Sequence, residues 1–117
     1  MIELIIKEYL EQKLGLTVVM EKPPEPPEEY VLVEKTGSSW ENLITTATVA
    51  VQSYSGSMYG AASLNKRVKQ AMEDITWKDE VSRCDLDTDY NYTDTAKKEY
   101  RYQAIYSLVY FDDFQEV

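Results

Sequence analysis

The aspartates of segment 85–94, DLDTDYNYTD, have the spacing that comes nearest to a metal-binding pattern in this chain. Calcium-binding loops use alternating acidic and amide oxygens, but they also need a glycine at a sharp turn and a late bidentate glutamate. The segment has neither, and its period of two is typical of a strand with one solvated side. We therefore predict a charged strand face rather than a calcium site. Its expected members are Arg83, Asp85, Asp87 and Asp89, with Cys84, Leu86, Thr88, Tyr90 and Tyr92 on the opposite face.

Segment 55–60, SGSMYG, precedes a helical pattern and could pass for a phosphate-binding turn. It lacks the lysine arrangement of a P-loop, and the order of its glycines fits no dinucleotide-binding fingerprint. A serine oxygen at this place can instead accept a hydrogen bond from a free amide of the first helical turn. We predict a strand-to-helix turn in which Ser55 or Ser57 caps the helix.

Nucleophilic catalysis has little support, because the chain contains one cysteine, Cys84, and no histidine that could activate it. The 21 acidic residues include many possible carboxylate pairs, but the sequence gives no reason to choose one of them. We therefore predict no catalytic, cofactor-binding or metal-binding residue, and we do not expect an enzyme.

The chain is acidic, with 21 Asp and Glu against 12 Lys and Arg among 117 residues. Sequence-specific nucleic-acid binding is not expected, because it requires clustered basic residues that neutralise phosphates. The N-terminal apolar run is too short and too often interrupted by charge for a signal peptide or a membrane span. A single cysteine excludes an intrachain disulfide and fits a reducing compartment. We expect one domain, 1–117, made in the cytoplasm without membrane contact.

The periodicity of the sequence predicts an α+β fold: a mainly antiparallel sheet with two helices packed on one face. The expected order is helix, hairpin, strand, helix, hairpin. The first helix ends before Gly15, and the second carries an apolar face from Ala61 to Ile75. The predicted strands are 16–20, 30–37, 44–54, the alternating region 80–94, and 100–111. Residues 38–43 are expected to form a polar loop and 112–117 a frayed acidic tail.

A proline-rich loop, 21–29, connects the first two predicted strands and contains all four prolines of the chain. Proline lacks an N–H and fixes φ, so this segment favours an extended, solvated conformation. A stiff loop loses little entropy when it docks, so we predict a contact role for this segment. A loop that only prevents pairing at a sheet edge is the alternative. The candidate contact residues are Pro23, Pro24, Pro26 and Pro27.

Ten tyrosines are the other feature that points to an interface. Tyrosine has an apolar body and a polar tip, and it is enriched where proteins meet. Ordinary core packing beneath the helices is the competing interpretation. The candidate interface tyrosines are Tyr30, Tyr90, Tyr92, Tyr100 and Tyr102.

Several segments together resemble a known family. They are VVMEKPPEPPEEYVLVEKTG, ITTATVAVQSY, the helix MYGAASLNKRVKQAMEDI, and the aromatic stretch DYNYTDTAKKEYRYQAIYSLVYF. The chain resembles the small tail-terminator or head–tail joining proteins of long-tailed phages and prophages of Gram-positive bacteria, related in fold to the phage lambda tail terminator. The resemblance covers nearly the whole chain. One departure is Gly37 followed by Ser38, where relatives often have two glycines.

The resemblance implies a structural protein without catalysis or cofactors. It implies a ring of copies, usually six, that caps the tail tube, stops tail polymerisation and offers a surface to the head. The implied partners are other copies of the chain, the tail tube protein and the head–tail connector or stopper protein. The protein would be in the host cytoplasm during assembly and in the tail or neck of the virion afterwards.

Two alternatives remain at this stage. A head-side stopper or another neck protein would form its ring on the head connector. An acidic binding module or inhibitor of a host protein would use regularly spaced aspartates such as Asp85, Asp87 and Asp89 to compete with DNA.

Overall fold

A single mixed sheet with two helices on one face makes up the fold. The computed structural model describes residues 1–42 and 44–111. Its elements are α1 (Ile2–Leu14), β1 (Val18–Val19), β2 (Tyr30–Glu41), β3 (Ile44–Ser55), α2 (Met58–Met72), the short 3-10 helix η1 (Ile75–Trp77), β4 (Val81–Asn91) and β5 (Tyr100–Tyr110). The strand order is β1-β2-β3-β5-β4, and only β1–β2 is parallel. The predicted α+β class is confirmed, whereas the predicted frayed tail, 112–117, lies outside the described residues.

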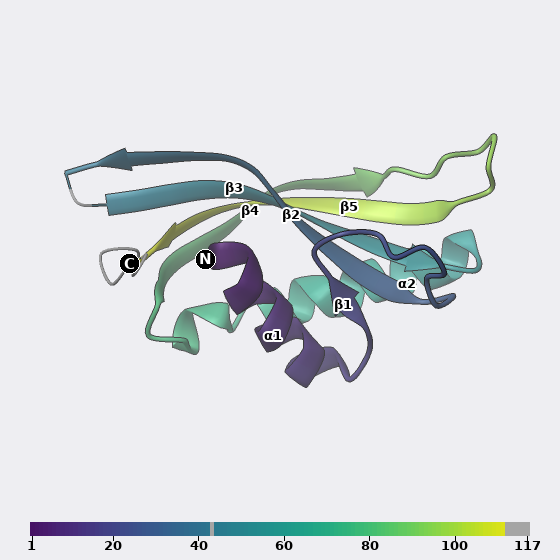
Figure 1. Ribbon diagram of the computed structural model, residues 1–117, viewed down its shortest axis with the longest axis horizontal. Coiled ribbons are helices and arrows are strands. Elements are labelled where there is room, and N and C mark those ends of the chain that lie inside the picture. Colours follow the sequence, from purple (N-terminus) through teal and green to yellow (C-terminus); the bar gives the residue numbers. More distant parts are fainter. Residues whose placement is uncertain (43, 112–117) are drawn as a thin grey trace.

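Both helices lie on the same side of the sheet (Figure 1), as the sequence predicted. Fully buried residues of α1, such as Ile6 and Leu10, and of α2, such as Leu64 and Val68, pack in one core with Val49 and other inward-facing sheet residues. No described helix covers the other side of the sheet, which we call the open face. The burial of one apolar stripe per helix is what holds this two-layer arrangement together.

The helix ends follow the signals in the sequence. Gly15 ends α1 in a left-handed conformation, with φ 67°, and its N–H donates to the Glu11 carbonyl. Ser57 is the N-cap of α2, and its Oγ accepts a hydrogen bond from the Gly60 N–H at 3.0 Å. Of the two predicted caps, Ser57 is therefore the one that satisfies a free amide of the first turn.

The first predicted hairpin, across the proline-rich loop, is wrong. β1 pairs parallel with β2, with Val18 opposite Val31 and Val19 opposite Leu32. A hairpin needs a tight reversal, which a stiff proline-rich segment does not make. The segment 20–29 instead returns the chain from the end of β1 to the level of its start. β2 therefore begins beside the start of β1 and runs in the same direction.

The first true hairpin joins β2 and β3, through residues that the sequence led us to read as a loop. β2 continues past Gly37 to Glu41, with a bulge between Lys35 and Gly37, and its last five residues pair with β3. This half of β2 is exposed throughout, so its polar composition resembles that of a loop. Asn42 follows in the left-handed region at φ 53°, as hairpin turns require. Figure 1 shows the end of β2 and the start of β3 at one end of the molecule and the β4–β5 connection at the other end.

The predicted alternation along β4 is interrupted by two register shifts, one between Val81 and Arg83 and one between Leu86 and Thr88. A bulge between Leu86 and Thr88 shifts the register against β5. Asp89 therefore lies on the helix side, where Asn65 and Lys69 of α2 donate hydrogen bonds to its carboxylate. Tyr90 consequently lies on the open face, opposite Gln103.

Candidate functional site

The aspartates of β4 do not converge on one point. Asp85 pairs with Arg83 at 2.6 Å, Asp87 accepts a hydrogen bond from Ser107, and Asp89 binds Lys69 on the other side of the sheet. The hydrogen bond from Lys69 is the main reason why the pKa of Asp89 is lowered. Within 1–42 and 44–111, no group of three acidic, cysteine or histidine side chains could hold a metal ion.

Cys84 lies half-buried on the helix side of β4. Burial raises the pKa of its thiol to about 12, and the nearby carboxylates of Asp85 and Asp87 act in the same direction. The side chain therefore stays a thiol near neutral pH, which makes it a poor nucleophile. This position fits the small, half-buried side chain expected from the sequence.

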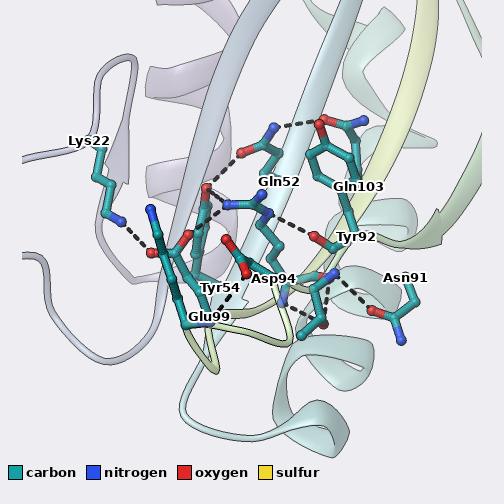
Figure 2. Close-up of polar contacts among 11 residues, drawn as sticks. Lys22, Gln52, Tyr54, Asn91, Tyr92, Asp94, Glu99 and Gln103 are labelled. Carbon is teal, nitrogen blue, oxygen red and sulfur yellow. Dashed lines mark hydrogen bonds and ion pairs between the residues drawn. The ribbon is translucent and has the colours of Figure 1, made fainter.

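The proline-rich segment lies against the rest of the molecule at two points. Lys22 forms an ion pair with Glu99, which precedes β5 (Figure 2). The Glu28 carboxylate packs closely against Gly56. Between these contacts Pro23 and Pro26 are half-buried, while Pro24 and Pro27 are exposed. The segment is therefore held against the domain, and of its prolines only Pro24 and Pro27 are exposed to a partner.

Two tyrosines of the open face stack where β2 begins and β3 ends. The rings of Tyr30 and Tyr54 are 4.4 Å apart and nearly parallel, and Leu32 and Val19 pack around them. Tyr30 is only 3% exposed, and burial raises its pKa to about 12. This predicted interface residue therefore belongs to the interior of the monomer and is not accessible as a contact.

Arg101 organises the polar side chains beside this stack, and Figure 2 labels three of its partners, Tyr54, Tyr92 and Glu99. Its guanidinium lies 5.7 Å from the Tyr54 ring and 4.7 Å from the Tyr92 ring. It also donates to the Glu99 carboxylate at 2.6 Å and to the Tyr92 carbonyl at 2.8 Å. Because Glu99 also binds Lys22, Arg101 links the proline-rich segment to the end of the β4–β5 hairpin.

A chain of hydrogen bonds continues from this cluster across three strands. Tyr54 donates to Gln52, Gln52 donates to Gln103, and Gln103 donates to the hydroxyl of Tyr90. The bonds are 2.6–2.8 Å long, and Figure 2 shows the first two, from Tyr54 to Gln52 and from Gln52 to Gln103. This network gives the uncovered face a defined, rigid polar surface.

Only two of the five candidate tyrosines meet on an accessible surface. Tyr90 and Tyr92 touch edge to face at 5.9 Å and are 41% and 43% exposed. Tyr100 and Tyr102 are half-buried and alternate with the residues of the open face, so they belong to the helix side. Arg101, Gln52 and Gln103 were not predicted as site residues from the sequence. Their alternation with the apolar positions of β3 and β5 was the signal that could have revealed them.

Both edges of the sheet carry unpaired strand segments. On one side β1 covers only Val31 and Leu32, so the part of β2 from 34 to 41, here called the β2 edge, has no further strand beside it in the described structure. On the other side β4 is the last strand, and its outer side, here called the β4 edge, is free of any described strand. Such edges present unpaired N–H and C=O groups to another chain.

Comparison of the sequence with protein-family models and with curated proteins finds no match. In the part of the chain that the structure describes, no helix is long and apolar enough to cross a membrane.

Proposed function

We propose that this chain is a structural virion assembly protein, which forms a ring on the tail tube of a long-tailed phage. In this role it ends tail polymerisation and provides the surface to which the head attaches. The proposal starts from the sequence resemblance given above. Its partners are other copies of itself, the tail tube protein and the head–tail connector or stopper protein.

The observation that carries the ring is the pair of unpaired edges on opposite sides of one sheet. A contact between two different surfaces of identical copies is heterologous, and it closes into a ring when the rotation allows. The β2 edge and the β4 edge are two such surfaces, and both offer backbone groups for pairing. This arrangement supports repeated head-to-tail association.

The alternative function, binding or inhibition of a host protein, rested on an acidic face that the described residues do not form. It relied on Asp85, Asp87 and Asp89 forming one evenly spaced acidic face. The bulge in β4 places Asp89 on the helix side, where Lys69 neutralises it, so the three carboxylates do not form such a face.

A polymerisation assay tests the proposed role. Purified tail tube protein from the phage or prophage that encodes this chain would be allowed to form tubes with and without the purified chain. We expect added protein, in amounts far below one copy per tube subunit, to stop lengthening and to appear as extra density at one tube end by electron microscopy. Tubes of unchanged length without such density would contradict the proposal.

A further inference from the structure

The two unpaired edges are matched in direction. β2 is antiparallel to β3, β3 to β5, and β5 to β4, so β2 and β4 run in opposite directions within one sheet. Rotation about a ring axis that lies roughly along the strands preserves these directions. The β2 edge of one copy therefore meets the β4 edge of the next copy in the antiparallel sense, with the helices of both copies on the same side.

We propose that the β2 edge of one copy pairs antiparallel with the β4 edge of its neighbour, and that Trp40 of the first copy fills a cavity beside Leu86 of the second. This inference rests on the proposed ring and names its contact. Trp40 is 60% exposed, although it belongs to a strand. It lies opposite Thr45, which lies opposite the buried Tyr110, so its side of the strand is the helix side.

The cavity lies on the helix side of β4, at the edge that the neighbour would meet. Its volume is about 270 Å³, and Lys69, Met72, Glu73, Cys84, Leu86 and Tyr106 line it. Tyr106 is 2% exposed, and its buried hydroxyl has no hydrogen-bond partner among the described residues. An indole brings apolar surface and one N–H donor, which matches a cavity with apolar walls and the Glu73 carboxylate.

The stagger between copies follows from the geometry of closed sheets. Strands in a closed sheet tilt by about 35–45°, so a unit four strands wide shifts its neighbour by roughly four residues along the strand. Residues that pair side by side across the strands of one copy form a row. Trp40 and Val81 belong to the same row, because Trp40 pairs with Thr45, Thr45 with Tyr110, and Tyr110 with Val81. Four rows further along β4, the helix-side residue is Leu86. A shift in the opposite direction would carry most of the β2 edge past the start of β4 and lose the pairing.

The charged side chains are compatible with this register. Glu41 of one copy falls beside Asp85 of the next, but Asp85 is already paired with Arg83, whose guanidinium can serve both carboxylates. Lys35 falls opposite Asn91, and Ser38 falls opposite Asp89. The seam therefore contains no like-charged pair without a countercharge.

Cysteine cross-linking tests the register. In the same alignment, Ser39 of one copy lies opposite Thr88 of the next on the open face, and both side chains are exposed. The variant Ser39→Cys/Thr88→Cys/Cys84→Ser, assembled on tail tubes and oxidised, should give disulfide-linked multimers on a non-reducing gel. The matched control, Ser39→Cys/Arg83→Cys/Cys84→Ser, places the second cysteine in the row that would meet Ser39 without a stagger. It should stay monomeric. Cross-linking of the control alone, or of neither variant on capped tubes, would overturn the inference.

Substitution of the tryptophan separates this inference from the proposed function. Trp40→Ala should raise the protein concentration needed to cap tubes by at least ~10-fold, as for a central interface residue. Trp77→Ala removes an equally large side chain that is 86% exposed, and it should have no such effect. If the unaltered chain caps tubes but Trp40→Ala caps them equally well, the inference fails and the proposed function stands. If the unaltered chain does not cap tubes at all, both fail.

Discussion

At the residue scale, Arg101 is the side chain that ties the most separate parts of the chain together. From the start of β5 it contacts the Tyr54 ring of β3 and, in the β4–β5 connection, the Tyr92 ring, the Tyr92 carbonyl and the Glu99 carboxylate. Its planar guanidinium can stack and donate at once, which a lysine ammonium cannot do. Arg101 therefore stabilises the end of the sheet where the proline-rich segment is fastened.

Replacement of Arg101 should destabilise the fold. We expect Arg101→Ala to lower the free energy of unfolding by about 1–3 kcal/mol, because the cation–π contacts and the charged hydrogen bonds are lost together. Arg101→Lys should recover only part of this loss. Arg83→Ala removes an exposed arginine with a surface ion pair, and it should change stability by less than about 0.5 kcal/mol. Urea unfolding of the three variants measures the difference, and equal effects of Arg101→Ala and Arg83→Ala would refute the assigned role.

At the element scale, α2 depends on its cap. The Ser57 hydroxyl satisfies the Gly60 amide, so Ser57→Ala should lower the free energy of unfolding by about 1 kcal/mol, and Ser57→Asp should preserve it. Ser63→Ala is the matched control, because Ser63 is exposed within the same helix and alanine has the higher helix propensity. It should be neutral or slightly stabilising. Thermal unfolding distinguishes the two serines, and losses of equal size would contradict the capping role.

The elements with strong local signals could be predicted from the sequence. The apolar stripes of α1 and α2, Gly15, Ser57 and the β-branched run of β3 all encode their structure within a few residues. The exposed half of β2 could not be recognised, because neither of its faces is buried and its polar residues lack the alternation of a half-buried strand. The parallel β1–β2 pair and the bulge in β4 arise from pairing between distant segments, which no local pattern records.

The same contrast between local signals and long-range pairing applies to the residues of the candidate site. Tyr90 and Tyr92 were predicted to share one face of a strand, and their rings do touch edge to face. Tyr30 was assigned to an interface because an aromatic residue at a strand start looks the same whether it is buried or exposed. Its stacking on Tyr54 depends on the register between β2 and β3, which the sequence did not predict. The Arg101 cluster depends on the fastening of segment 20–29 and so was hidden for the same reason.

At the scale of the whole molecule, the chain is elongated, at 44 × 26 × 24 Å, with its strands running along the long direction. One face is covered by helices, and the other carries the ordered network from Tyr54 to Tyr90. With two open edges, such a unit suits association side by side more than stacking face to face. A ring built in this way from copies with net charge −9 would carry strong negative charge, which suits a passage for DNA that must not bind it.

The most direct test of the central claim is electron microscopy of particles from the phage or prophage that encodes this chain, after deletion of its gene. The account predicts tails of uncontrolled length beside filled heads without tails, because nothing ends the tube or makes it joinable. Tails of normal length beside heads that leak DNA would instead place the protein on the head side, as a stopper. Intact, infectious particles would contradict a role in virion assembly altogether.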